Sequence, residues 1–248
     1  MGAEHMSFDL NGKTAIVTGA ARGIGLAISR RFSELGARVS GWDLSTDVAQ
    51  DEDCFAHLVD VDVSDEASVA VGFAASLDAL GHVDILVANA GINGPTKPAW
   101  EYSLAEWQEV IDVDLTGVFL STRAVLPEMR ARGTGRIIVT SSVAGKEGNP
   151  GACAYGAAKS GVIGYVKGLA RELLPSEVTV NCVAPVMTET DLLTGMSDDY
   201  IADKRGRIPM ERFCTPKEVA DMTAWIASPL CSFTTGQVFD ITGGRATY

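Results

Sequence analysis

The sequence predicts an α/β fold, built as a doubly wound parallel sheet of about seven strands with helices on both faces. Short runs rich in β-branched residues alternate with longer stretches of helical periodicity along the whole chain. Most of these short runs are apolar throughout, as expected for strands that are covered on both faces. With 248 residues, 46% of them hydrophobic, the chain can bury one large core. We therefore expect residues 1–248 to form a single domain.

The expected elements follow one another in a regular order. Strands are predicted at residues 13–18, 38–42, 57–61, 84–89, 136–141, 178–183 and 237–242. Helices are predicted for "GIGLAISRRFSEL", which Gly36 closes, for "EASVAVGFAASLDAL", which Gly81 closes, and for residues 103–131 and 152–174. The longest irregular region, 184–215, follows the sixth strand. Because such sheets bind ligands beyond the carboxyl ends of their strands, we expect this region to form a substrate lid.

Charge and composition exclude several classes of partner. The formal net charge of -12 would repel nucleic acid and anionic membrane surfaces. No apolar run approaches the roughly 20 residues that a membrane-spanning helix needs. A small-molecule substrate is expected instead, with neither nucleic acid nor membrane as a partner.

The cysteines and histidines indicate the cellular compartment and bear on whether a metal is bound. The five cysteines, Cys54, Cys153, Cys182, Cys214 and Cys231, include no CxxC pair, which favours free thiols in a reducing, cytoplasmic compartment. His5, His57 and His82 are far apart in the sequence, so no metal site is expected. The opening residues, "MGAEHM", are interpreted as an added leader before a native start at Met6.

A glycine-rich turn, "TGAARGIG" at residues 18–25, connects the first strand to the first helix. Gly19, Gly23 and Gly25 would allow a tight turn and let a pyrophosphate approach the helix N-terminus, where free N–H groups favour anions. The spacing is G-x-x-x-G-x-G, and glycines alone could serve chain reversal. The position of the turn nevertheless favours a dinucleotide site in a Rossmann-like fold.

Asp43 ends the second strand, 18 residues beyond Gly25. A carboxylate there could accept hydrogen bonds from the adenosine ribose and would repel a 2'-phosphate, which favours NAD over NADP. A turn or capping role is the alternative for Asp43. Arg22 and Arg38 point the other way, since either could reach a 2'-phosphate.

Tyr155 and Lys159 are four residues apart on a predicted helix, so their side chains leave the same face one turn from each other. Oxidation of a secondary alcohol needs a base for the hydroxyl proton, and a neighbouring ammonium favours ionisation of a phenol. Ser142, at the end of the fifth strand, could hold the alcohol oxygen. An exposed helical pair and an ordinary turn serine are the alternatives.

These motifs resemble the short-chain dehydrogenase/reductase family over essentially the whole chain. The resemblance lies in "TGAARGIG", "DV" at residues 62 and 63, "NAG" at 89–91, and the spacing S-x12-Y-x3-K. It implies that Tyr155 is the general acid/base, that Lys159 activates it and binds the nicotinamide ribose, and that Ser142 holds the substrate oxygen. It also implies a homotetramer built through helices 103–131 and 154–174, together with carboxyl-terminal contacts.

The resemblance assigns a set of cofactor-binding residues around NAD. They are Gly19, Arg22, Gly23, Ile24, Gly25, Asp43, Asp62, Val63, Asn89, Ala90, Gly91, Tyr155, Lys159, Pro185, Thr188 and Thr190. Asp62 and Val63 would meet the adenine, and Thr190 the carboxamide region.

Two positions depart from the family pattern. Asp114 stands where the family usually has an asparagine that anchors a water relay to the active-site lysine, and it joins the predicted catalytic set. The alternative is that Asp114 faces solvent or caps a kink in the long helix. Val186 replaces the usual glycine after Pro185 and restricts the backbone beside the nicotinamide.

The sequence constrains the identity of the substrate less than it constrains the fold or the cofactor. Pocket residues are expected at 94–100, 146–153 and 187–200, and the stretches 145–150 and 231–248 resemble a branch of the family that oxidises 2-keto-3-deoxy sugar acids with NAD. Candidate partners for a substrate carboxylate are Lys97, Lys146, Arg205 and Arg207. Two alternatives stay open: a 3-oxoacyl thioester reductase using NADPH, and a catalytically idle dinucleotide-binding protein.

Overall fold

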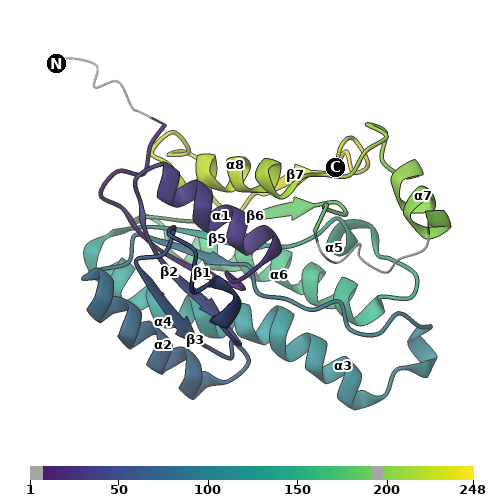
Figure 1. Cartoon of the computed structure of the whole chain (residues 1–248), viewed down its shortest axis with the longest axis horizontal. Helices are drawn as coiled ribbons and strands as arrows, with labels where there is room; N and C mark the ends of the chain where they lie inside the picture. The colour runs from purple at the N-terminus through teal and green to yellow at the C-terminus, as the bar shows by residue number, and fades with distance from the viewer. Residues whose placement is uncertain (1–7, 191–197) are drawn as a thin grey trace.

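The computed structural model of the chain describes residues 8–190 and 198–248 and contains one parallel sheet (Figure 1). Its strand order is β3-β2-β1-β4-β5-β6-β7, and all neighbouring strands are parallel. The strands are β1 (Thr14–Thr18), β2 (Arg38–Asp43), β3 (His57–Asp60), β4 (Ile85–Ala88), β5 (Thr134–Thr140), β6 (Glu177–Pro185) and β7 (Val238–Ile241). The predicted doubly wound α/β fold is confirmed, with each strand within a few residues of its expected position.

Helices cover both faces of this sheet (Figure 1). On one face lie α1 (Gly23–Glu34) and α8 (Pro216–Ala227), and on the other lie α2 (Glu66–Leu80), α4 (Gly117–Arg132) and α6 (Cys153–Glu172). Shorter helices are α3 (Leu104–Ile111), α5 (Ala144–Glu147) and α7 (Asp198–Gly206), with single turns at Asp47–Ala49 and Ala99–Glu101.

Alternate residues of each central strand supply the two halves of the core. In β1, Ile16 packs with α2, α4 and α6, while Ala15 and Val17 pack with α1 and α8. In β5, Val139 and Ile138 divide in the same way. A strand buried on both faces has no polar side, which explains why the sequence shows no alternation there.

The long helix expected at 103–131 is interrupted. It begins at Ser103, whose hydroxyl and Glu106 form a reciprocal capping box, but residues Asp112–Thr116 form a π-helical turn between α3 and α4. The one-helix prediction was therefore wrong at this turn, which a 3.6-residue periodicity cannot distinguish from regular helix. The turn places Asp114 inside the protein, with 0% of its surface exposed.

The region 184–215 is also more ordered than its composition suggested. Pro185 ends β6, Thr188 forms an isolated parallel bridge with Cys214, and α7 occupies Asp198–Gly206. The expectation of an irregular segment was thus wrong for part of this region. The predicted pocket residues Leu192 and Leu193 lie outside the described residues.

Candidate active site

The glycine-rich turn closes tightly at the carboxyl end of β1. Gly19 and Gly23 have φ values of +64° and +56°, in the left-handed region that glycine tolerates best. A Cβ on Gly25 would lie 1.9 Å from the carbonyl oxygen of Gly19, so that position requires glycine. Arg22 is exposed and has no side-chain hydrogen bond to the first turn of α1. This cradle fits a dinucleotide pyrophosphate at the helix N-terminus next to Ile24.

Asp43 lies beside this turn. Its Oδ2 accepts a hydrogen bond from the N–H of Ala21 at 2.9 Å, and its Oδ1 accepts one from the N–H of Leu44 at 2.9 Å. The carboxylate therefore faces the glycine turn, where an adenosine ribose would lie. Arg38 is at the opposite end of β2 and donates to two carbonyl groups at the end of α2. The expectation that Arg38 could reach a 2'-phosphate was wrong.

Asp62 and Val63 lie in the loop after β3, and Val63 packs against the start of α4. Oδ1 of Asp62 accepts hydrogen bonds from the N–H and the hydroxyl of Ser64, at 2.9 and 2.6 Å. Val63 is buried, and a Cβ on Gly117 would lie 2.9 Å from its Cγ2.

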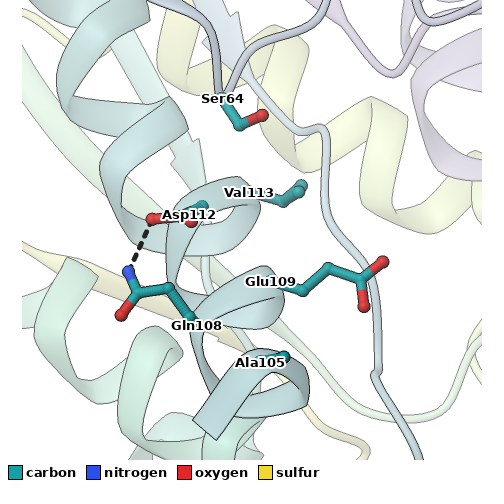
Figure 2. Close-up of a pocket in the computed structure, with 6 residues that line it drawn as sticks. All are labelled: Ser64, Ala105, Gln108, Glu109, Asp112 and Val113. Carbon is teal, nitrogen blue, oxygen red and sulfur yellow. Dashed lines mark hydrogen bonds between the residues drawn. The ribbon is translucent and has the colours of Figure 1, made fainter.

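A cavity of about 370 Å³ opens beyond this loop (Figure 2). It is lined by Ser64, Ala105, Gln108, Glu109, Asp112 and Val113. Figure 2 shows Ser64 facing the end of α3, with Asp112 bonded to Gln108 at the other side. The cavity thus adjoins the predicted adenine position and does not include Ser142 or Tyr155.

Asn89, Ala90 and Gly91 follow β4 and tie the strand ends together. The amide of Asn89 donates to the carbonyl oxygen of Thr18 at 3.1 Å and accepts from the Thr140 hydroxyl at 3.2 Å. Thr18 itself accepts the N–H groups of Asn89 and Ala90 at 2.9 Å each. Sequence reasoning missed Thr18 and Thr140. Their positions as the last residues of β1 and β5 could have indicated them.

The structure brings Tyr155 and Lys159 together on α6, as their spacing predicted. The ammonium of Lys159 is 5.6 Å from the centre of the Tyr155 ring. Tyr155 is half-buried against a small apolar cluster that includes Val110 and Ala158, and Lys159 is 3% exposed. An exposed helical pair, the alternative interpretation, is therefore excluded.

Ser142 is the second residue after β5 and is 8% exposed. Its Oγ accepts a hydrogen bond from the N–H of Ala144 at 3.1 Å, which leaves the hydroxyl hydrogen available for a ligand. The neighbouring Ser141 donates from its hydroxyl to the carbonyl oxygen of Lys159 at 2.9 Å. This second serine was not predicted, and it joins the end of β5 to α6 at the lysine.

Asp114 forms a buried ion pair with Lys159. Its Oδ2 lies 3.1 Å from the lysine Nζ, and its Oδ1 accepts the N–H of Ile92 at 2.7 Å. A Cβ on Gly91 would lie 3.0 Å from Oδ2 and 3.2 Å from Nζ, so glycine leaves room for the pair. The aspartate contacts the lysine directly, and the alternative that Asp114 faces solvent is wrong.

This pair sets the charge of the lysine. Burial on its own lowers the pKa of Lys159, but the Asp114 carboxylate, together with smaller contributions from Tyr155 and Cys182, outweighs that effect, and the pKa of Lys159 lies above its ordinary value. Nζ also donates to the carbonyl oxygen of Thr140 at 3.0 Å. Asp114 Oδ2 contacts the ammonium as an ion pair without a well-aligned hydrogen bond, so the bond to Thr140 leaves ammonium hydrogens for a ligand hydroxyl.

Beyond β6, the chain runs past the glycine turn. Thr190 lies over it, since a Cβ on Gly23 would be 3.6 Å from the Thr190 methyl group. The Thr188 hydroxyl donates to the carbonyl oxygen of Val186 at 3.0 Å. Val186 is 5% exposed and packs with Ile208. The valine side chain therefore belongs to the core under the lid region, and its N–H joins β7.

Three of the four candidate carboxylate partners already have acidic partners. Lys97 contacts both carboxylate oxygens of Glu106, at 2.7 and 2.8 Å, and Arg207 contacts Asp203 at 2.8 Å. Lys146 lies 2.6 Å from Oδ2 of Asp240. Arg205 stacks on Phe213 at 5.5 Å. The expected role of the three paired cations in holding a substrate is therefore not supported by their contacts.

All five cysteines are free thiols, as predicted. Among the residues that the structure describes, no cluster of three metal-ligating side chains occurs. No helix in the described ranges is long and apolar enough to cross a membrane.

The chain was compared with known protein families and with characterised proteins. A family model described as enoyl-(acyl carrier protein) reductase matches residues 19–246. A 2-dehydro-3-deoxy-L-rhamnonate dehydrogenase (NAD(+)) from Sphingomonas sp. (strain SKA58) is 44% identical over 240 residues, which cover 96% of each chain. A 3-oxoacyl-(acyl-carrier-protein) reductase from Aquifex aeolicus (strain VF5) is 38% identical over 96% of this chain and 99% of that one.

Solved structures show the same fold. The crystal structure of a 3-ketoacyl-(acyl-carrier-protein) reductase from Brucella melitensis complexed with NADH superposes with a TM-score of 0.90 at 33% identity, covering 96% of this chain and all of that one (100%). The match to the family model extends over Gly19, Gly23 and Gly25 and over Ser142, Tyr155 and Lys159. The chain belongs to the short-chain dehydrogenase/reductase family of oxidoreductases.

Proposed function

We propose that this enzyme is an NAD-dependent dehydrogenase that oxidises a secondary hydroxyl group of a sugar acid of the 2-keto-3-deoxy type. The main support for an alcohol dehydrogenase reaction is that Tyr155 lies beside the charged Lys159, with Ser142 at the same edge of the sheet. The similarity to the Sphingomonas enzyme supports the substrate class, and Asp43 at the end of β2 supports NAD.

The residues suggest how the proton is handled. When bound, NAD supplies the hydride acceptor at its nicotinamide ring. Tyr155, as phenolate, takes the proton of the substrate hydroxyl, and the ammonium of Lys159 stabilises the phenolate charge. The free hydrogen of Ser142 is donated to the substrate oxygen and holds it while the carbonyl forms. An N–H of Lys159 that is not bonded to Thr140 would meet a ribose hydroxyl of the cofactor.

Asp114 has a positioning role in this proposal. Because it contacts Lys159 directly and accepts the Ile92 N–H, it fixes the ammonium between β4, β5 and α6. The ammonium is thereby kept near the Tyr155 ring, whose centre is 5.6 Å away. This differs from the asparagine-anchored water relay that the family resemblance implied.

A 3-oxoacyl thioester reductase is the second candidate. The Aquifex relative carries this name, so the similarity favours it as well. The family model is described as an enoyl-(acyl carrier protein) reductase, which also names an acyl thioester as the substrate but a different reaction. The Asp43 carboxylate argues against NADPH, because it would repel the 2'-phosphate. A cytoplasmic homotetramer remains a prediction for either function.

One panel of assays distinguishes the candidates. Purified enzyme is offered 2-keto-3-deoxy sugar acids, polyols and 3-oxoacyl thioesters, each with NAD(H) and with NADP(H). We expect the highest kcat/KM for a sugar acid with NAD. A higher kcat/KM for a thioester with NADPH would replace the first proposal by the second, and turnover in neither case would exclude both.

A further inference from the structure

The short helix α5 links the proposed substrate-holding serine to the lysine helix. Ser142 lies just before α5 and accepts the N–H of Ala144. On the inner side of α5, a Cβ on Gly145 would lie 2.7 Å from the carbonyl oxygen of Lys159, and the Ser160 hydroxyl donates to the Gly145 carbonyl at 2.7 Å. The position of Ser142 relative to α6 therefore depends on where α5 lies.

On its outer side, α5 meets two opposite charges from the end of the chain. Lys146 lies 2.6 Å from Oδ2 of Asp240 in β7, and Glu147 accepts from Nε of Arg245 at 3.0 Å. Both pairs are mostly covered, with side-chain exposures of 10% and 25% for the first and 14% and 24% for the second. Partly buried pairs of this kind are less screened than surface pairs.

Two further contacts complete the arrangement. Nη2 of Arg245 donates to Oδ1 of Asn149 at 3.2 Å, and the Tyr248 hydroxyl donates to the carbonyl oxygen of Lys146 at 3.0 Å. The Tyr248 ring centre lies 5.0 Å from the ammonium of Lys146. The last residues of the chain thus hold both the side chains and the backbone of α5 and the loop after it.

We propose that Asp240, Arg245 and Tyr248 form a C-terminal clamp that positions α5 and thereby Ser142, with Arg245 as its main positioning residue. The inference rests on the proposed role of Ser142 in holding the substrate oxygen. No residue of the clamp contacts Tyr155 or Lys159 through a described hydrogen bond, so it acts only through α5.

The short helix α5 needs contacts from outside itself to be stable. A helix of one turn, such as Ala144–Glu147, is not stable by itself, because nucleation is costly and few hydrogen bonds offset it. The order of charges also fixes the register of α5. A shift of one residue would bring Lys146 toward Arg245 or Glu147 toward Asp240, and each like-charge contact is unfavourable.

The first test replaces Arg245 by Met and compares it with Arg30→Met. Arg30 forms a two-point ion pair with Glu52 outside the proposed site, so its loss controls for removing a guanidinium. We expect Arg245→Met to lower kcat about 10-fold, since displacement of a substrate-holding group by a fraction of an ångström is costly. The Kd for NAD should not change. Arg245→Lys should restore most of kcat. Glu147→Gln removes the other partner of the ion pair and should lower kcat to a similar extent.

The second test needs no substrate. Hydrogen exchange is measured for the same variants at the amides of Gly145, Lys146, Glu147 and Gly148, which donate to the carbonyl groups of Ser142, Val143 and Ala144 at the start of α5. We expect exchange to quicken about fivefold in Arg245→Met and to recover in the charge swap that combines Glu147→Arg with Arg245→Glu.

The outcomes separate the clamp from the proposed function. Unchanged exchange in Arg245→Met would overturn the clamp whatever the substrate. Faster exchange with unchanged kcat would overturn the positioning role. If the wild-type enzyme oxidises no alcohol, the proposed function fails, and the exchange rates still decide whether the clamp holds α5.

Discussion

The carboxylate of Asp114 lies 3.1 Å from the ammonium of Lys159, and neither side chain is more than 3% exposed. A neutral amide could not make the same two contacts. Its single oxygen would bond either the Ile92 N–H or the ammonium, and its NH₂ group would then face another donor. The aspartate is therefore matched to a direct contact with the lysine.

The first prediction follows from this geometry. In Asp114→Asn, Lys159 loses its counter-charge, and removal of the nearby negative charge favours ionisation of Tyr155. We expect the enzyme to stay active, with the pH profile of alcohol oxidation displaced toward lower pH by about one unit. Its free energy of unfolding should fall by about 3 kcal/mol, because a buried charge loses its partner.

Asp112→Asn is the matched control. Asp112 lies in the same π-helical turn but bonds Gln108 beside the cavity of Figure 2, away from Lys159. Rate against pH is measured for the wild type and both variants. An identical profile in Asp114→Asn would show that the two residues are not coupled, and complete loss of activity would show that the carboxylate has another role.

The second prediction concerns the cofactor. We expect the wild type to bind NAD much more tightly than NADP. Asp43→Asn should raise the Kd for NAD about 10-fold, because charge-assisted hydrogen bonds to the ribose are lost, and should tighten NADP binding. Asp60→Asn, on the neighbouring strand, is the control, since Asp60 bonds only Thr46 among the described residues. Titration of both cofactors into the apo protein measures the ratio, and a wild-type preference for NADP would refute the assignment.

The third prediction concerns the proposed acid/base. Tyr155→Phe should keep cofactor binding and lower turnover by about 100-fold or more. Tyr165 offers a control on the same helix, because its hydroxyl bonds that of Thr122 at 2.6 Å and lies away from Lys159. Single-turnover measurements on both variants compare the effects, and wild-type turnover in Tyr155→Phe would remove this residue from the mechanism.

Local pattern was sufficient for much of the fold and for part of the site. The central parallel strands are buried and largely apolar, the partly buried edge strands β3 and β7 are short runs of the same kind, and all seven could be located. The helical period alone placed Tyr155 beside Lys159. The glycine turn was recognisable because its chemistry lies within eight consecutive residues. These features depend only on residues close together in the chain, so they can be recognised from the sequence alone.

Contacts between distant segments could not be predicted in this way. Nothing in the residues near Asp114 shows that its carboxylate meets Lys159, 45 positions later, because that contact depends on the π-helical turn and on the packing of α6. The direction of Arg38 likewise follows from its place at the start of β2, one strand length from Asp43. The contacts of Arg245 with α5 join segments about 100 residues apart.

The last prediction concerns acid stability at the start of α8. Hydrogen bonds from Arg212 and from the backbone N–H of Thr215 lower the pKa of the Glu218 carboxyl to about 2, well below its ordinary value of 4.5. A lowered pKa means that the folded state binds the proton less readily than the unfolded chain. The stabilisation is thus fully present above pH 4.5 and is lost as the pH falls toward 2.

Glu218→Gln should therefore lower the Tm at neutral pH, and its difference from the wild type should shrink steadily between pH 4.5 and the region near 2. The effect should be small, because 40% of the Glu218 side chain and 53% of Arg212 are exposed and solvent screens the pair. Lys217→Gln is the control: Lys217 is 75% exposed and pairs with Asp221 on the same helix. Thermal unfolding at a series of pH values tests the sign, and a difference that grows as the pH falls would contradict the assigned linkage.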